Sequence, residues 1–497
     1  MSGSGHRLVV GIEVHVQLAT RTKAFCACPV EFGAEPNRHV CPVCLGHPGA
    51  LPTLNRAVLE AAIRAGLALD CRVAPKGHTQ WDRKNYFYPD LPKGYQITQY
   101  EFPVCEGGAV VLSDGTRVRI RRAHVEEDTG KSSHASDGET LVDFNRAGVP
   151  LLEIVTEPVD PATPERVEEY LRLLQEKVRL AGASDCSMEK GQMRCEPNVS
   201  LARSDGSSTA ISEIKNINSF AAVREAVAAE AKRLADGPWH PAGTTLPRAT
   251  FGWDDSAKRT ILQRTKETAA DYRYFPEPDL PVIPTEALEE FVGRAKAALA
   301  EAEATRDRAA GSTREAAGRY GLTAEQADLL LAKDMTKGRY VAAVEAASRD
   351  LPVSEVAPEI ANWFLGPLAA WVNGHGGAWE TLRITPEDIA AACSGLHRGK
   401  FTAQVVKANL LAGDYPGIGG DPEKYLASKG LLGGAAGEDA VRAACAEAIA
   451  ANPDVVAKIR GGKPQAKAAL VVQVMKKTRG TADPARVNAI LDELLKG

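Results

Sequence analysis

Long apolar runs are missing from this sequence of 497 residues. The longest, residues 468–475, contains Gln473 and is far shorter than the roughly 20 residues that a membrane-spanning helix needs. The amino terminus, MSGSGHRLVVGIEVHV, has no apolar segment of the kind that a signal peptide requires and runs directly into a strand pattern. We therefore expect a cytoplasmic protein with no membrane span.

An excess of charge of one sign is also missing, since 60 Lys and Arg stand against 64 Asp and Glu, a net charge of -4. Binding to RNA would then depend on a local basic patch. Neither a phosphate loop (GxxxxGKS/T) nor a nucleophile elbow (GxSxG) occurs. Gly130 and Lys131 match the end of a phosphate loop, but Val125 stands where its first glycine belongs. Any ATP must therefore bind through a metal-centred cavity.

What the sequence contains points to three regions of different composition. Hydrophobic residues at 44% and charged residues at 25% are ordinary for a globular protein, and a chain of this length should form roughly two to four domains. Residues 1–290 alternate strand patterns with glycine-rich turns, residues 291–411 have helical spacing, and residues 412–497 begin with a glycine-rich break. We expect an α+β fold: a mixed or antiparallel sheet domain, an all-α domain and a small all-α tail.

The strand patterns of the first region leave one polar face uncovered. Residues 117–124, 194–201 and 211–216 alternate apolar side chains with arginines, acids and amides. This pattern favours a polar cavity over an ordinary solvated surface. Two helices interrupt the strands: one follows the cap residue Thr163 with Pro164 at its first position, and the other covers about residues 219–235.

Glu153 lies inside the apolar run Leu-Leu-Glu-Ile-Val, where a carboxylate is tolerated only if it is paired, hydrogen-bonded or bound to a metal. Strict alternation over residues 12–18 places Glu13 and His15 on one face of the first strand. Together with Glu127 of the acidic stretch HVEED, these residues form an oxygen-rich set with one imidazole, which suits Mg²⁺ or Mn²⁺ better than Zn²⁺. The alternative is an ion-pair network with nearby arginines, namely Arg119, Arg121, Arg122 and Arg146.

Four of the ten cysteines form a cluster with the spacing CxC and then CxxC: Cys26, Cys28, Cys41 and Cys44. In a reducing compartment this spacing predicts a structural Zn²⁺ site and not a pair of disulfides. Four thiolates complete the zinc tetrahedron. Such a site would brace the loop after the first strand and take no part in the chemistry.

Two further segments have aromatic and basic character. Residues 82–90 (DRKNYFYPD) and 271–279 (DYRYFPEPD) could stack on a base, or could be packed loops that cover a sheet edge. In the tail, residues 458–479 include seven lysines and arginines and no acid. Such a run is typical of a solvated helix face, or of a surface that follows a phosphate backbone.

Six motifs resemble those of one family: GIEVHVQL, DRKNYFYPDLPKGYQITQ, HVEEDTGKSSH, LVDFNRAGVPLLEIVTEP, EIKNINSF and DYRYFPEPDLP. In this order they are similar to the B subunits of bacterial aspartyl/glutamyl-tRNA(Asn/Gln) amidotransferases, the GatB family. The resemblance implies an amino-terminal cradle domain, a helical domain and a tail similar to the YqeY family. It also implies a ligase that uses ATP to phosphorylate the side-chain carboxylate of Glu or Asp misacylated on tRNA. Ammonia from glutamine, released by a partner amidase (A) subunit in a heterotrimer with a small C subunit, then gives Gln-tRNA(Gln) or Asn-tRNA(Asn).

Carried onto this sequence, the resemblance implies roles for individual residues. The family's Mg²⁺ site corresponds to Glu13, His15, Glu127 and Glu153. Positive charge for the acyl phosphate and the nucleotide comes from Lys84, Arg194 and Lys215. The four cysteines match a zinc knuckle that some members have. The expected tRNA contacts of the tail are Lys463, Lys467, Lys476, Lys477 and Arg479.

One departure from the family pattern is Val472, where the family often has glycine. Two other functional classes remain open on the residues alone. A metal-dependent kinase or ligase for a small molecule would need the acidic cavity but neither the basic tail nor a partner. A non-catalytic RNA-binding scaffold would need the tail but would have no use for Glu153 in an apolar run.

Overall fold

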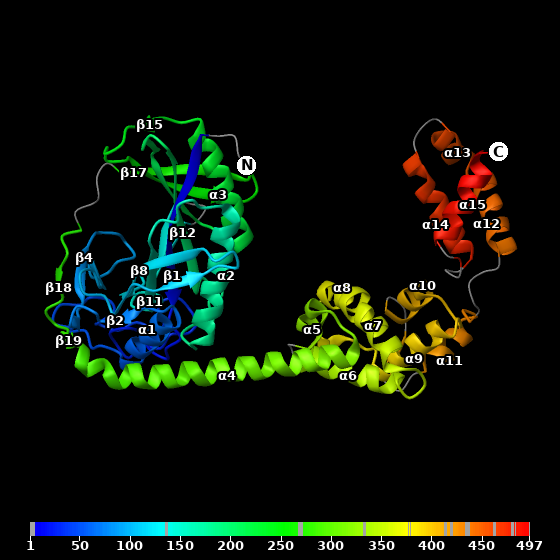
Figure 1. Cartoon of the computed structure of the whole chain (residues 1–497), viewed down its shortest axis with the longest axis horizontal. Coiled ribbons are helices and arrows are strands. Elements are labelled where there is room, and N and C mark those ends of the chain that lie inside the picture. Colours follow the sequence, from blue (N-terminus) through cyan, green and yellow to red (C-terminus); the bar gives the residue numbers. More distant parts are fainter. Residues whose placement is uncertain are drawn as a thin grey trace. The chain divides into compact units, whose positions relative to one another are not determined.

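The computed structural model describes the chain over residues 5–134, 138–266, 272–331, 334–375, 377, 379–411, 415–417, 421–432, 438–460, 464–478, 482 and 484–496. Two compact units, Met1–Thr305 and Arg306–Gly497, divide the chain within helix α4 (Glu289–Tyr320). Figure 1 shows the sheet of the first unit and the helices of the second. None of the described helices has both the length and the apolar character that crossing a membrane requires.

A twelve-stranded mixed sheet forms the first unit. Along its main path, β14 and β16 run parallel and the other neighbours run antiparallel. This arrangement confirms the predicted α+β fold with a mixed sheet. In spatial order the strands are β17 (Arg259–Lys266), β16 (Arg248–Asp254), β14 (Ile211–Lys215), β12 (Met193–Arg203), β1 (His6–Gln17), β11 (Pro150–Thr156), β8 (Arg117–Glu127), β6 (Cys105–Glu106) and β2 (Arg72–Val73).

Shorter strands complete the first unit. Three of them join the large sheet off its main path: β7 (Ala109–Val111), β13 (Ser208–Thr209) and β15 (Trp239–His240). Small separate sheets pair β9 (Lys131–His134) with β10 (Thr140–Asp143), β3 (His78–Thr79) with β19 (Ile283–Pro284), and β4 (Asp82–Asn85) with both β5 (Tyr95–Thr98) and β18 (Phe275–Pro276). Pairing of β4 with β18 brings the two aromatic and basic segments side by side.

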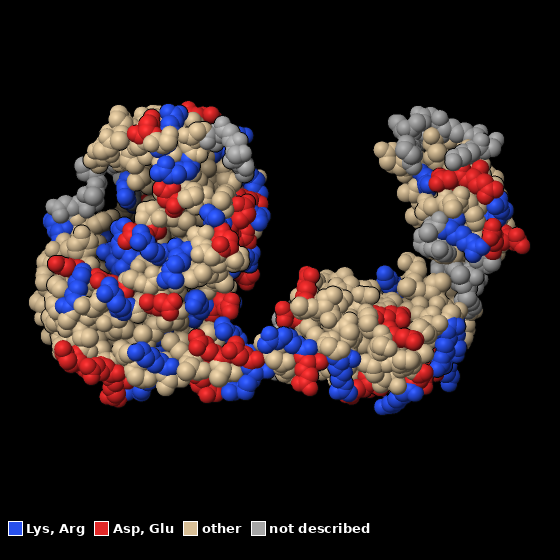
Figure 2. All heavy atoms as spheres, viewed as in Figure 1, with Lys and Arg blue, Asp and Glu red and all other residues tan. Residues whose placement is uncertain are grey.

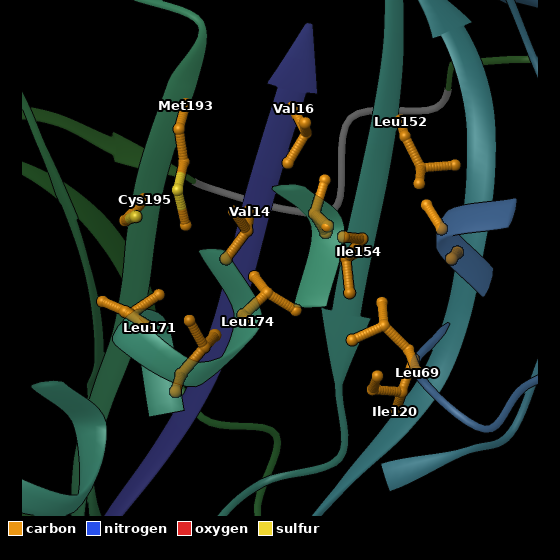
Figure 3. Close-up of a cluster of buried hydrophobic side chains, with 14 of the residues drawn as sticks. Val14, Val16, Leu69, Ile120, Leu152, Ile154, Leu171, Leu174, Met193 and Cys195 are labelled. Atoms are coloured by element: carbon orange, nitrogen blue, oxygen red, sulfur yellow. The ribbon is translucent and has the colours of Figure 1, made fainter. Parts of the chain in front are cut away.

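One face of the large sheet packs against helices α1 (Arg56–Ala68), α2 (Pro164–Leu180) and α3 (Phe220–Ala235) in a single hydrophobic cluster. Figure 3 shows buried side chains of β1, β11 and α2 in this cluster: Val14, Val16, Leu152, Ile154, Leu171 and Leu174. Because successive side chains of a strand point to opposite faces, Glu13, His15 and Glu153 lie on the other face. The core therefore determines which side of the sheet can hold a polar site.

The two predicted helices begin where the sequence indicates. Thr163 and Ser219 are the caps, and each side chain accepts a hydrogen bond from the backbone N–H three residues later. Helix α1, capped by Asn55, was not predicted. Small residues supply much of its buried stripe, and Gly66 leaves no room for a Cβ atom because the Cys105 side chain lies against it.

A β-bulge between β8 and β11 changes which side chains of β8 face the core. Val155 pairs with Arg122, but the next residue, Thr156, pairs with Ile120, so β8 has one extra residue at this point. Val118 and Ile120 are buried in the core before the bulge, whereas Ala123 and Val125 are buried there after it. Even-numbered residues from 122 onward therefore face the polar side of the sheet.

The second unit is helical and contains two hydrophobic clusters, one over residues 317–431 and one over residues 441–491. After α4 its helices are α5 (Ala324–Leu331), α6 (Asp334–Ala347), α7 (Val353–Trp363), α8 (Ala369–Gly374), α9 (Pro386–His397), α10 (Ala403–Val406), α11 (Pro422–Ser428), α12 (Glu438–Ala451), α13 (Pro453–Arg460), α14 (Lys467–Lys477) and α15 (Pro484–Lys496). Short 3-10 helices are η1 (Thr285–Leu288, in the first unit), η3 (Trp379–Thr381) and η5 (Pro464–Ala466), and π-helices are η2 (Phe364–Leu368) and η4 (Lys407–Leu411).

The predicted boundaries after residues 290 and 411 remain predictions. Packing joins Tyr415, which lies within the glycine-rich break, and Leu426, which follows it, to the first of the two helical clusters. The Tyr415 hydroxyl donates a hydrogen bond to Asp388 Oδ1 at 2.6 Å, which joins the glycine-rich break to helix α9.

Candidate active site

Three strands bring two acids and a histidine together on the polar face of the sheet. His15 of β1 pairs with Glu153 of β11, and Glu126 lies two residues after His124, the β8 partner of Glu153. His15 Nε2 lies 3.3 Å from Glu126 Oε1 and 3.7 Å from Glu153 Oε2. Ligand atoms of His15, Glu126 and Glu153, here named the acid–histidine cluster, lie within 4.8 Å of one another. One divalent cation would fit all three.

Burial and nearby charges shift the pKa values of the two acids of this cluster in opposite directions. Burial raises the pKa of Glu126 well above its usual range, and the neighbouring Glu153 raises it further. Burial also acts to raise the pKa of Glu153, but His124, His15 and Lys84 outweigh it and hold that pKa well below the usual range. The raised pKa of Glu126 favours its protonated form, and a bound cation would favour the ionised form instead.

The donor set fits a hard divalent cation. Glu126 and Glu153 are 3% and 9% exposed, so their charge is poorly compensated by water. His124 Nε2 lies 3.3 Å from Glu153 Oε2, and burial lowers the pKa of His124, which favours its neutral ring. The Nδ1 atoms of His15 and His124 are buried and have no hydrogen-bond partner among the described residues. Two carboxylates with one imidazole suit Mg²⁺ or Mn²⁺.

Lys84 supplies positive charge beside the acid–histidine cluster. Its ammonium lies 4.9 Å from the ring centre of Tyr272 and 5.9 Å from that of Tyr86. Burial alone would lower the pKa of Lys84, but Glu126 and other nearby groups raise it above its ordinary value, so the side chain stays charged. Two aromatic rings thus lie beside a cation that is near the two acids.

The aromatic segments are partly packed and partly exposed. Arg83 donates two hydrogen bonds to Glu277, at 2.7 and 2.8 Å, which supports the prediction of packed loops. Phe87 and Tyr88, in contrast, are 76% and 55% exposed. The structure therefore supports packing for one part of these segments and leaves a second part open to a ligand.

Arg194 of β12 lies in the row of paired residues that contains His15 and Glu153. Its guanidinium contacts Asp128 Oδ2 at 3.0 Å. Burial acts to lower the pKa of Arg194, but Asp128 more than compensates and the pKa is raised. Arg194 is therefore a charged group held next to the acid–histidine cluster.

A second acidic group lies on the same face of the sheet, two residues before His15 on β1. Glu13 pairs with Glu196, and their carboxylate oxygens lie within 4.8 Å of one another and of Glu213. Lys215 Nζ lies 2.7 Å from Glu196 and 3.6 Å from Glu213. Burial acts to lower the pKa of Lys215, but Glu196 and Glu213 raise it. Glu13 and Lys215, both predicted site residues, therefore belong to this second group.

The polar face of the first unit is basic as well as acidic. Figure 2 shows Lys and Arg side chains gathered, with acids among them, over the region where Figure 1 places β8 and β12. Such mixed charge suits a ligand that is anionic and binds together with a metal ion.

Comparison with known proteins decides the family. Two family models match the chain: a GatB/GatE catalytic domain over residues 8–289 and a GatB domain over residues 345–495. The chain is 43% identical to the B subunit of aspartyl/glutamyl-tRNA(Asn/Gln) amidotransferase from Thermus thermophilus over 99% of both chains. It is 42% identical to the protein of the same name from Anaeromyxobacter dehalogenans over 98% of both chains. The chain belongs to the GatB family.

A third relative of the same name, from Symbiobacterium thermophilum, is 39% identical over 100% of this chain and 99% of the relative. These matches confirm the family resemblance that the motifs indicate. Between them the two GatB-family matches leave residues 290–344 uncovered, where most of α4, all of α5 and part of α6 lie.

Within this GatB-family chain, the structure does not bring Glu127 to the predicted metal site. Glu127 points to the core face, where it forms an ion pair with Lys93 and accepts a hydrogen bond from the Ile97 N–H at 2.9 Å. Glu126 takes its place because the bulge reverses the alternation of β8. Sequence reasoning could have found Glu126 only through His124, which lies two residues earlier and hence on the same face.

The four cysteines converge as predicted. One sulfur atom from each of Cys26, Cys28, Cys41 and Cys44 lies within 4.8 Å of the others, and none forms a disulfide. The pKa of Cys44 is lowered, chiefly because the Cys26 thiol hydrogen-bonds to it. This group, here named the four-cysteine site, has the ligand type and number that Zn²⁺ prefers.

The predicted tRNA contacts of the tail are in part neutralised. Lys467 Nζ lies 2.7 Å from Asp492, and Lys477 forms an ion pair with Glu447. Lys476 is exposed and has no acidic partner among the described residues. Lys463 and Arg479 lie outside the described residues.

Proposed function

We propose that the chain uses ATP to phosphorylate the side-chain carboxylate of Glu-tRNA(Gln) or Asp-tRNA(Asn), and that ammonia then displaces the phosphate to give Gln-tRNA(Gln) or Asn-tRNA(Asn). The observation that carries the proposal is the acid–histidine cluster with Lys84 and Arg194 beside it. Phosphoryl transfer depends mainly on positioning and on neutralising charge, and these residues offer both. The names of the three relatives agree with this reaction.

His15, Glu126 and Glu153 are the residues that would hold Mg²⁺ in this reaction. A bound Mg²⁺ supplies charge neutralisation at phosphate oxygens. Of the residues named from the sequence, Glu13 lies in the neighbouring group with Glu196, where Lys215 would supply positive charge for a nucleotide phosphate. Glu127 instead forms an ion pair with Lys93 on the core face of the sheet.

The residues around the cluster have separate tasks. Lys84 and Arg194 are half-buried and stay charged, so they would hold the phosphate that moves and the carboxylate that receives it. The rings of Tyr86 and Tyr272 beside the Lys84 ammonium would help to orient it. The four-cysteine site, in the loop after β1, would hold structural Zn²⁺.

Partners complete the reaction. An amidase (A) subunit that hydrolyses glutamine is the source of ammonia, and a small C subunit joins the two in a heterotrimer. The tail would contact the tRNA, with Lys476 as its most available described lysine. Lys463, Lys467, Lys477 and Arg479 complete the set of expected contacts.

Replacing Glu153 with Gln tests the proposal in an enzyme reconstituted with the A and C subunits, glutamine, ATP and Glu-tRNA(Gln). We expect formation of Gln-tRNA(Gln) to fall to background while tRNA binding persists, because the lowered pKa of Glu153 makes it the acid of the cluster that favours the charged form a metal ion needs. The matched control is Glu189→Gln, at an exposed turn position. Amidation by the Glu153 variant at the wild-type rate would exclude Glu153 from the mechanism.

The same reconstituted enzyme separates the alternatives. ATP turnover that requires misacylated tRNA supports the proposed reaction. Turnover without tRNA would indicate a ligase for a small molecule. Tight tRNA binding without any ATP turnover would indicate an RNA-binding scaffold.

A further inference from the structure

Lys23 is a fully buried lysine with no carboxylate partner among the described residues. Its ammonium donates hydrogen bonds to the carbonyl oxygen of His39 at 2.8 Å and to that of Phe144 at 3.3 Å. It also donates to Cys44 Sγ at 3.5 Å. A buried ammonium without a counter-charge is costly, so negative charge must be supplied nearby. Four thiolates around one Zn²⁺ carry a net negative charge, and one of them is the Cys44 contact of Lys23.

The carbonyls that Lys23 binds belong to two different segments. His39 lies in the loop of the four-cysteine site, and Phe144 lies in the turn that leads into β11. Other hydrogen bonds join the same two segments: the His39 N–H donates to Asn145 Oδ1 at 2.8 Å, and the Phe144 N–H donates to Asn37 Oδ1 at 2.7 Å. The cysteine loop and the turn are therefore joined by several hydrogen bonds, and Lys23 binds to both of them.

The same turn contacts the active-site strands. Gly148 has φ +87°, and a Cβ atom placed there would lie 3.4 Å from Lys23 Cδ and 3.5 Å from Cys44 Cβ. The Gly148 N–H donates to the carbonyl oxygen of Asp128 at 2.9 Å. Asp128 in turn holds Arg194, and β11 carries Glu153. Hydrogen bonds thus join Cys44 to Lys23 and Lys23 to Phe144, and the turn that begins at Phe144 joins Asp128 through Gly148, beside the acid–histidine cluster.

We propose that Lys23 is a positioning residue that couples the four-cysteine site to the active-site strands, because its ammonium balances the thiolate charge and anchors the turn of residues 144–149. The proposal rests on the zinc site and the reaction proposed above. Hydrogen bonds to metal-bound ligands orient those ligands and raise metal affinity. Lys23 does this for Cys44 and, with the same ammonium, fixes the turn.

Lys23→Met in the full chain tests the coupling, since Met keeps most of the volume and removes the charge and the donors. We expect Zn²⁺ to pass to a chelator about tenfold faster than from the wild-type chain. The thiolate-to-metal absorption band of the Co²⁺-substituted chain should shift, and amide hydrogen exchange over residues 142–149 should accelerate. Lys23→Arg, which keeps a charged donor, should restore the band and part of the protection.

The matched control is Lys190→Met. Lys190 is exposed and lies 5.8 Å from the ring centre of Phe32 in the cysteine loop, so it shares the neighbourhood but makes none of the bonds of Lys23. It should match the wild-type chain in all three measurements. Wild-type zinc retention, absorption band and amide exchange in the Lys23→Met chain would overturn the proposal.

Two outcomes separate this proposal from the zinc site on which it rests. If the wild-type chain binds no Zn²⁺, the zinc proposal fails. Amide hydrogen exchange over residues 142–149 in the metal-free chains then decides whether Lys23 anchors the turn. Faster exchange in Lys23→Met supports the anchor, and equal exchange overturns it. If Lys23→Met does not fold, removal of Zn²⁺ from the wild-type chain decides the coupling. Faster exchange over the same residues supports it, and unchanged exchange overturns it.

Discussion

On the polar face of the first unit, charged residues that are far apart in the sequence come together in the fold. In the tail, basic residues that are close in the sequence are in part neutralised by the fold. The acid–histidine cluster draws on three strands, and its carboxylates are buried, so their fields are weakly screened. The tail has seven bases and no acid in one stretch, yet Lys467 and Lys477 are paired with acids from other helices. A run of like charge along the chain is therefore weak evidence for a charged surface, whereas a lone acid in an apolar strand is strong evidence for a site.

The largest expected effect separates Glu126 from Glu127. Glu126→Gln should lower kcat of the reconstituted enzyme about 100-fold or more, because a catalytic metal supplies several kcal/mol of charge stabilisation. It should also weaken Mn²⁺ binding measured by electron paramagnetic resonance. Glu127→Gln is the control for metal binding, since Glu127 faces Lys93 on the core side. Loss of Mn²⁺ binding in the Glu127 variant alone would contradict our assignment of the bulge.

The next effect concerns stability on the core face. Glu127→Gln leaves the Lys93 ammonium, which is 9% exposed, without its carboxylate, and we expect the free energy of unfolding to fall by about 3 kcal/mol. Urea denaturation of the first unit within the full chain measures it. The control is Glu157→Gln, whose partner Arg121 is 56% exposed, and its effect should stay below about 1 kcal/mol. Equal losses in the two variants would show that burial does not set the strength of these pairs.

A pH dependence follows from the raised pKa of Glu126. In the metal-free fold this carboxyl keeps its proton at pH values at which the unfolded chain has lost it, so its contribution to stability is lost as pH rises through the raised pKa. We expect Tm of the metal-free chain to fall over that interval and Mg²⁺ to oppose the fall. Calorimetry with and without Mg²⁺ measures both effects. A Glu126→Gln chain with the same pH profile would assign the titration to another group.

The smallest effect belongs to the tail. Lys476→Glu should raise KM for tRNA and reduce the slope of log KM against log salt by about 1, as expected for one phosphate contact. Lys467→Glu should do less, because Asp492 already neutralises that lysine. Measuring KM over a series of salt concentrations gives both slopes. If neither variant changes the slope, the basic stretch is an ordinary solvated helix face.

Much of the fold could be predicted because it depends on neighbours in the chain. Alternation places His15 and Glu13 on the face opposite the core, and caps at Thr163 and Ser219 start two helices. The four cysteines lie close together in the sequence, as CxC and then CxxC, so one loop brings their sulfur atoms together. Helix α1 escaped prediction because alanine and glycine give a weak periodic signal.

Residue order alone was enough to establish the family, the polar face of β1 and β11, and the four-cysteine site. Strand pairing was needed to show that Glu126 and not Glu127 joins His15 and Glu153, because the bulge arises from the pairing of β8 with β11 and reverses a two-residue period. The folded chain was also needed to show which tail lysines are neutralised and where Lys23 lies, since such contacts join residues that are distant in sequence. Local periodicity says which side of a strand a residue faces only until the partner strand forces an extra residue into the ladder.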